Sequence, residues 1–262
     1  MGPILTLTTD FGLRDHYVGT MKGVILSRCP KARIVDISHG VPPFSIWPGA
    51  YTIDQAATYF PAGTIHVVVV DPGVGTARRA ILVEAIGQRF IAPDNGVLSM
   101  ILSRDSGAMV REITNRDLFL PALSATFHGR DLFAPVAAWL ASGAASSDQV
   151  GPVLSTVELL PNVEPVQKSE DGWTGTVLSV DHFGNVVTNF TASRFSLGDF
   201  TIEIHGRSIA AARKTFGDSS AGGECFSYNG SSGFIELGIN QDSAAAFLGA
   251  VPGDRVGLKA KG

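Results

Sequence analysis

The feature that most constrains the fold is the run His-Val-Val-Val-Val-Asp at residues 66–71. Consecutive valines place β-branched apolar side chains on both faces of an extended segment, which is typical of a parallel strand covered by helices on both sides. The strand is predicted over residues 64–70. Three further short apolar runs, at residues 4–9, 33–37 and 89–92, also end at an acidic residue or a turn sequence.

Helical patterns lie between these runs. Residues 17–27 carry apolar side chains at helical spacing, residues 48–60 begin with Pro48 and stop before a second proline, and residues 131–141 repeat the pattern. Strands that alternate with helices indicate a mostly parallel sheet with helices packed on it. We therefore predict an N-terminal α/β domain over residues 1–160.

The sequence changes character after about residue 155. Residues 159–172 contain two prolines and four charges, and we predict a linker over residues 161–171. Beyond it the apolar runs are short and punctuated by turns, at residues 173–180, 200–204, 234–239 and 255–258. This pattern predicts a smaller antiparallel β-barrel domain over residues 172–262.

Charge argues against a nucleic-acid partner, because the 262-residue chain has a net charge of −4 and no basic excess. The N-terminus lacks the basic segment of a signal peptide, and no apolar run approaches the roughly 18 residues of a membrane helix. Cys29 and Cys225 lie far apart and show no metal-ligand spacing, as expected of free thiols in a reducing compartment. We expect a soluble cytoplasmic protein without a membrane partner.

Two aspartates follow predicted strands. Ligands of open α/β sheets bind outside the carboxyl ends of the strands, where Asp10 and Asp71 are expected. An aspartate after a strand is also a common turn former or helix cap. Two of them on one edge, each beside glycines, favour a polar site there.

The loop after Asp71 resembles a dinucleotide-binding fingerprint only in part. Gly73 and Gly75 supply its first two glycines, but Arg78 occupies the third position, and the acidic residue before the loop would repel a pyrophosphate. No phosphate-binding GxxxxGK[ST] motif occurs either. A nicotinamide-dependent oxidoreductase is therefore a weak alternative.

Three other polar segments stand out, at residues 126–131, 181–185 and 229–233. His128 precedes a predicted helix, where it is either a packed imidazole or a site residue. Asp181 and Asn185 offer a carboxylate and an amide, which can recognise an ammonium group and an adenine edge. Each segment taken alone is equally well explained as a turn.

Together these segments resemble a known family. The motifs TDFG (9–12), DPGVGTARR (71–79), APDNG (92–96), TFHGRD (126–131), DHFGN (181–185) and SSGF (231–234) occur in this order. The chain resembles the S-adenosyl-L-methionine (SAM) hydroxide adenosyltransferases, which are SAM hydrolases related to the fluorinases and chlorinases. The resemblance extends over nearly the whole chain.

The resemblance implies an α/β domain joined to a β-barrel, a homotrimer with sites between subunits, and hydrolysis of SAM to adenosine and L-methionine without a metal or cofactor. It assigns the attacking water to a catalytic trio, Asp71, Arg78 and His128. In the related halogenases the positions of Asp71 and His128 carry other residues. Whether Asp71 or His128 takes the proton stays open.

The resemblance also assigns substrate contacts. Asp10 would hold the ribose hydroxyls, Asp181 the methionine ammonium and Ser231 its carboxylate. Asn185 would bind the adenine edge, with Phe183 stacked on the ring. Some relatives have an arginine at the position of Ser232, so fewer charge-assisted bonds are expected here. Two alternatives remain: a halogenase, opposed by the negative charge of Asp71, and a SAM or adenosine sensor without useful turnover.

Overall fold

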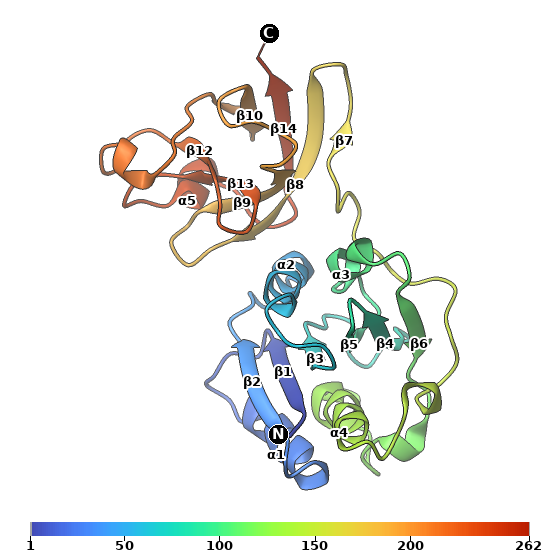
Figure 1. Ribbon diagram of the computed structural model, residues 1–262. Coiled ribbons are helices and arrows are strands. Elements are labelled where there is room, and N and C mark those ends of the chain that lie inside the picture. The colour runs from blue at the N-terminus through green and yellow to red at the C-terminus, as the bar shows by residue number, and fades with distance from the viewer. Residues whose placement is uncertain (1, 262) are drawn as a thin grey trace. The chain divides into compact units, whose positions relative to one another are not determined.

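The computed structural model describes residues 2–261. The chain divides into two compact units, residues 1–160 and residues 161–262. Figure 1 shows helices and a sheet in the first unit and mainly strands in the second.

The first unit is built on a six-stranded sheet of order β2-β1-β3-β5-β4-β6. The strands are β1 (Ile4–Thr9), β2 (Arg33–Ser38), β3 (Ile65–Val69), β4 (Ala80–Ala85), β5 (Gln88–Pro93) and β6 (Met109–Glu112). β2, β1, β3 and β5 pair in parallel, which confirms the mostly parallel sheet. β4 and β6, which were not predicted, pair antiparallel. Only Ile86 and Gly87 separate β4 from β5, too few residues for a parallel crossover.

Helices cover both faces of this sheet, as the valine run predicted. They are α1 (Tyr17–Arg28), α2 (Ile46–Ala57), α3 (Ser99–Arg104) and α4 (Ala134–Ser142). Val67 and Val69 belong to one apolar cluster, with side chains of α1 and α4. Val68 and Val70 belong to another, with side chains of α2 and α3. Successive strand residues point to opposite faces, so one valine run fills two cores.

Two helices differ from their predicted bounds. α2 begins two residues before Pro48, which is tolerated because the first backbone N–H groups of a helix have no partner within it. The predicted helix at residues 131–141 is a π-helical turn, Gly129–Phe133, followed by α4. π-Helical turns are rare in proteins, and those that occur are often found at functional sites.

The second unit is an antiparallel sheet of order β11-β10-β14-β8-β9-β13-β12, with β7 paired to β8. Four strands correspond to predicted runs: β8 (Gly172–Val180), β10 (Phe200–Ile204), β13 (Phe234–Gly238) and β14 (Arg255–Ala260). The others are β7 (Val166–Gln167), β9 (Val186–Thr191), β11 (Arg207–Ile209) and β12 (Phe226–Asn229), with one short helix, α5 (Ala244–Leu248). β7 lies within the stretch predicted as a linker.

The sheet of the second unit nearly closes on itself, in agreement with the predicted barrel. Residues just after β11 pair with β12 at the other end of the strand order. The Ser227 N–H donates to the Ala211 carbonyl at 2.9 Å, and the Arg213 N–H donates to the Ser227 carbonyl at 3.0 Å. This pairing covers backbone groups that an open sheet would leave at its edges.

The last residues of the first unit are held by an ion pair from two of the sequence motifs. Arg79 Nε donates to Asp94 Oδ2 at 2.8 Å. Arg79 Nη2 also donates to the Thr156 carbonyl at 3.1 Å, and Asp94 Oδ1 accepts from the Glu158 N–H at 2.8 Å. The pair therefore fixes residues 156–158, just before the second unit begins.

Across residues 2–261, the helices are all too short or too polar to traverse a lipid bilayer.

Candidate active site

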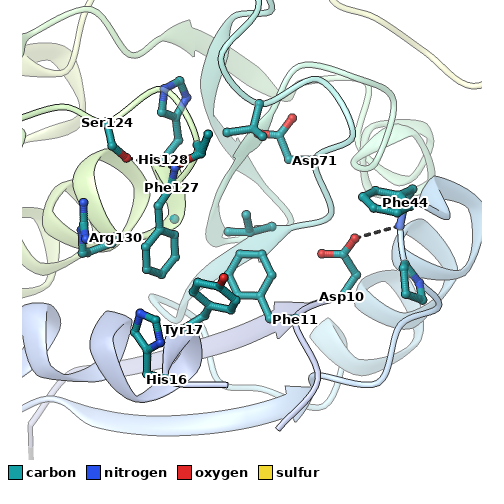
Figure 2. A pocket seen from close by; sticks show the side chains of 15 residues that line it. Asp10, Phe11, His16, Tyr17, Phe44, Asp71, Ser124, Phe127, His128 and Arg130 are labelled. Carbon is teal, nitrogen blue, oxygen red and sulfur yellow. Dashed lines mark hydrogen bonds between the residues drawn. The ribbon is translucent and has the colours of Figure 1, made fainter. Parts of the chain in front are cut away.

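Asp10 and Asp71 lie at the same edge of the sheet. Asp10 follows β1, Asp71 follows β3, and these strands pair in parallel with Thr9 beside Val69. Both aspartates line one pocket of about 680 Å³, shown in Figure 2. Its other lining residues are Phe11, His16, Tyr17, Pro43, Phe44, Val69, Val74, Ser124, Thr126, Phe127, His128, Gly129 and Arg130.

Arg78 joins Asp71 and His128 into one cluster. Its Nε donates to both oxygens of Asp71 at 3.0 Å, and its Nη2 donates to Oδ2 at 2.5 Å. The same Nη2 contacts His128 Nδ1 at 2.8 Å. The side chains of Asp71 and Arg78 are only 4% and 10% exposed. Arg78 thus holds together two residues, Asp71 and His128, that line the pocket.

Gly75 allows the loop that carries Asp71 and Arg78 to approach the loop at residues 124–128. Gly75 has a φ of +79°, and a Cβ atom there would lie 2.3 Å from the Ala125 carbonyl oxygen. Any other residue would push the loop of Asp71 and Arg78 away from residues 124–128. The glycines after Asp71 therefore bring together two loops far apart in the sequence.

The hydrogen bonds define the protonation state of His128. A guanidinium group can only donate, so Nδ1 accepts from Arg78 and the ring proton is on Nε2. Burial and the positive charge of Arg78 lower the pKa of His128 from its usual value. His128 is thus a neutral imidazole at neutral pH, and it lines the pocket with its ring proton on Nε2.

Asp10 is held from the opposite side of the pocket. Its Oδ2 accepts a hydrogen bond from the Phe44 backbone at 2.9 Å, drawn as the dashed line in Figure 2. Burial raises the pKa of Asp10, and the charge of Asp71 adds to the effect, whereas the hydrogen bond from Phe44 lowers it. Phe44 has a φ of +66° and is 72% exposed. An apolar ring is thus presented at the pocket rim beside a carboxylate.

Three aromatic side chains that the sequence analysis did not single out also line the pocket. Phe11, Tyr17 and Phe127 contact one another edge to face, with ring centroids 5.1 to 5.9 Å apart. Phe11 and Phe127 stand inside the motifs TDFG and TFHGRD, which could have marked them. Tyr17 begins α1 and carried no such signal.

In the second unit, Asp181 and Asn185 close a turn between β8 and β9. Asp181 Oδ1 accepts from the backbone N–H groups of Phe183 at 2.9 Å and Asn185 at 2.8 Å. Its Oδ2 accepts from the Asn185 side chain at 2.8 Å. The segment therefore forms a turn, as one of the two sequence-based explanations had it. Phe183 on this turn is 77% exposed.

The remaining predicted residues also lie in the second unit. Phe183 and Asn185 line a pocket of about 620 Å³ with Phe216, Ile239, Asn240, Gln241, Asp242 and Ser243. Ser231 is exposed on the turn between β12 and β13. The hydroxyl of its neighbour Ser232 donates to Glu236 at 3.1 Å. The structure thus gathers Asp10, Asp71, Arg78 and His128 in one unit and the other predicted residues in the other.

Residues 2–261 contain no group of three or more His, Cys, Asp or Glu side chains arranged to hold a metal ion. Cys29 and Cys225 are both buried free thiols. Burial raises the pKa of Cys225 to about 11, so this thiol stays protonated at neutral pH.

The fold and site define an α/β protein with an added antiparallel β unit and an Asp–Arg–His cluster at the carboxyl edge of its parallel strands. Both parts of the chain match known family models. The model of the SAM hydroxide adenosyltransferase N-terminal domain matches residues 5–151, and that of the C-terminal domain matches residues 175–257. The chain belongs to the SAM hydroxide adenosyltransferase family.

Individual relatives agree with this assignment. The chain is 42% identical to an (R)-S-adenosyl-L-methionine hydrolase of Salinispora tropica over 98% of each sequence. It is 27% identical to a fluorinase of Actinopolyspora mzabensis over 93% of this chain and 92% of that protein. The crystal structure of an uncharacterized conserved protein from Thermotoga maritima has a TM-score of 0.86 and 40% identity, covering 98% of this chain and 99% of that one.

Proposed function

We propose that this protein hydrolyses SAM to adenosine and L-methionine. The observation that carries the proposal is the Arg78 side chain, which holds Asp71 and His128 together at the pocket wall. Support also comes from relatives of 40–42% identity that are named (R)-S-adenosyl-L-methionine hydrolases. Their name indicates the R epimer at sulfur as the substrate.

The nucleophile is a water molecule between Asp71 and His128. Asp71 Oδ2 accepts two hydrogen bonds from Arg78, whereas Oδ1 accepts one and keeps a free lone pair, so Oδ1 can accept the proton of the water. His128 instead presents Nε2–H, which orients the water by donating to its oxygen. The geometry therefore favours Asp71 as the proton acceptor. Arg78 positions both groups rather than touching the water.

The displacement needs little other assistance. The water oxygen forms a bond to ribose C5′ as the C5′–S bond breaks, and the bonding electrons move to the positively charged sulfur. Methionine leaves as a neutral thioether, so no general acid is needed, and no metal or cofactor is part of the proposal. Placing water in line with C5′ supplies the main rate gain.

Substrate contacts follow the predicted residues. Asp10 binds the ribose hydroxyls, since a carboxylate accepts two hydrogen bonds. Asp181 binds the ammonium and Ser231 the carboxylate of the methionine moiety, while Phe183 and Asn185 bind adenine. We further propose a cytoplasmic homotrimer in which each site combines the first unit of one subunit with the second unit of its neighbour. A closed head-to-tail ring of three has three such sites.

Product analysis tests the reaction. The purified protein is incubated with the separate R and S epimers of SAM, with and without a chelator, in water labelled with oxygen-18. We expect equal amounts of adenosine and methionine from the R epimer, with the label at the 5′-oxygen and no effect of the chelator. Binding without turnover would instead indicate a sensor.

The halogenase alternative has its own outcome in the same assay. Added chloride or fluoride would give a 5′-halogenated nucleoside if the pocket accepted a halide. The carboxylate of Asp71 opposes this by repelling an anion. A halogenated product in place of adenosine would overturn the proposal.

Complementation tests the shared site. Chains carrying Asp71→Asn and chains carrying Asp181→Ala, each inactive alone and differently tagged, are co-expressed and purified through both tags. Shared sites restore part of the activity, because some interfaces pair two intact halves. Inactive mixed oligomers would refute shared sites and leave the hydrolase proposal standing.

A further inference from the structure

A buried carboxylate lies beneath one of the substrate-binding turns of the second unit. Glu236, on β13, is 8% exposed. Its Oε2 accepts a hydrogen bond from the Tyr228 hydroxyl at 2.6 Å, and its Oε1 accepts one from the Ser232 hydroxyl at 3.1 Å. Burying a carboxylate costs free energy unless it is hydrogen-bonded, so the Tyr228 and Ser232 hydroxyls are both needed to stabilise Glu236 in this position.

The turn is shaped around this side chain. Tyr228 and Glu236 pair across β12 and β13, and residues 230–233 connect the two strands. A Cβ atom on Gly230 would lie only 1.9 Å from Glu236 Oε1. The carboxylate therefore occupies the space that a side chain at position 230 would take, and the backbone of the turn closes over it.

Glu236 also interacts with the other turn that is proposed to bind the methionine moiety. Burial raises the pKa of Glu236, the hydrogen bonds from Tyr228 and Ser232 lower it, and the charge of Asp181 raises it again. One buried group thus contacts the turn that carries Ser231 and interacts electrostatically with Asp181.

We infer that Glu236 is a positioning residue for SAM, which fixes the turn at residues 230–233 through Ser232 so that Ser231 meets the carboxylate of the methionine moiety. The inference rests on the proposed function. Glu236 also gives the Ser232 hydroxyl a partner within the protein. Ser231 and the backbone of the turn are then left to bind the substrate carboxylate. An arginine at position 232 would meet Glu236 as an ion-pair partner.

The test separates positioning from general support of the unit. Glu236→Gln keeps the size of the side chain but offers one acceptor oxygen in place of two. KM for SAM and the inhibition constant of adenosine, which lacks the methionine moiety, are measured together. We expect KM to rise roughly fivefold to tenfold, which corresponds to about 1–1.4 kcal/mol and to the loss of one hydrogen bond. The kcat value and the adenosine constant should stay within about twofold.

Two further variants complete the design. Glu203→Gln, on an exposed position of β10, is the matched control and should change neither constant. Ser232→Ala removes only the donor at the turn and should raise KM in the same direction, with no further increase when it is combined with Glu236→Gln. It keeps the test decisive if Glu236→Gln does not fold.

An unchanged KM in the variants, or an equal weakening of SAM and adenosine binding, would overturn the inference. The hydrolase proposal would survive both results. Conversely, a wild-type protein that releases no adenosine from SAM would refute the proposed function. Calorimetry of SAM binding to the wild-type and Glu236→Gln proteins would then still test the positioning role.

Discussion

In the first unit Asp71 is 4% exposed and has both carboxylate oxygens bound by Arg78, whereas in the second unit Phe183 is 77% exposed on the tip of a turn. The groups proposed to act in the reaction are thus held in place by the protein itself, while the groups proposed to recognise the substrate are presented on exposed turns. Charges that are already oriented do not have to reorganise during the reaction. Recognition residues can instead complete their contacts when the substrate binds.

The largest expected effect breaks the cluster of the first unit. Asp71→Asn removes the proposed proton acceptor and the charged partner of Arg78, so kcat should fall by roughly 10²–10⁴-fold with little change in SAM binding. Arg78→Ala should act in the same direction, with partial recovery in Arg78→Lys. Steady-state kinetics and calorimetry provide the measurements, and exposed Asp117→Asn is the control. A large loss of affinity with unchanged kcat would contradict these roles.

The next prediction compares the stability of the two units in acid. His66 is fully buried, with Thr6 Oγ1 at 2.7 Å and Gln88 Oε1 at 3.1 Å from its ring nitrogens. Burial lowers the pKa of His66 from 6.5 to about 4. Between these values the unfolded chain binds a proton that the folded chain does not, so the first unit loses about 3 kcal/mol as pH falls from 6.5 to 4.

The second unit should respond in the opposite sense at Glu236. Burial raises the pKa of this carboxyl, so the folded state binds its proton first and gains stability as pH falls.

Each unit has one buried thiol, Cys29 or Cys225, and urea unfolding can be followed by labelling each with a disulfide reagent active in mild acid. Cys29 should become reactive at lower urea at pH 4.5 than at pH 7. His66→Gln should remove most of that shift; an unchanged shift would exclude His66 as its source.

A smaller effect is expected at Asp10, which is partly buried and is proposed to bind the ribose. Because burial raises its pKa, protonation should weaken SAM binding at a pH above the usual range for aspartate. KM should rise by about tenfold in Asp10→Asn, and that variant should lose the acid limb of the pH profile of KM. Adenosine inhibition should weaken in parallel. An intact acid limb in the variant would place the titrating group elsewhere.

The smallest effect is expected from removing only the charge of Asp181, because exposed ion pairs contribute only about 0.2–1 kcal/mol. Asp181→Asn keeps an oxygen for the backbone N–H groups of Phe183 and Asn185 and removes the charge, so KM should rise about twofold to fivefold with little change in Tm. Asp181→Ala also loses the hydrogen bonds that hold the turn of Phe183 and Asn185, so it should lower Tm and abolish most of the activity, as the complementation test requires. Equal Tm losses in both variants would show that the charge itself stabilises the turn.

Much of the first unit could be predicted from local sequence. The valine run at residues 66–71 required a strand buried on both faces, and the turns after each apolar run placed Asp10 and Asp71 at strand ends. β4 was not predicted because its two-residue connection to β5, rather than residue type, makes it antiparallel, and β6 was not predicted because it pairs with β4, which is not its neighbour in the chain. In the second unit β9 and β12 were not predicted because their side chains pack into a sheet that is formed by distant segments.

The sequence by itself determined the two-part architecture and the polar residues at strand ends and turns, because strand periodicity, turn residues and short motifs are local signals. Tertiary structure decided which of these residues meet. Arg78 reaches His128, 50 positions away in the chain, only because Gly75 lets two loops approach. Glu236 became a buried partner of Tyr228 and Ser232 only when β12 and β13 paired. Contacts of this kind depend on the packing of distant segments, which no local pattern specifies.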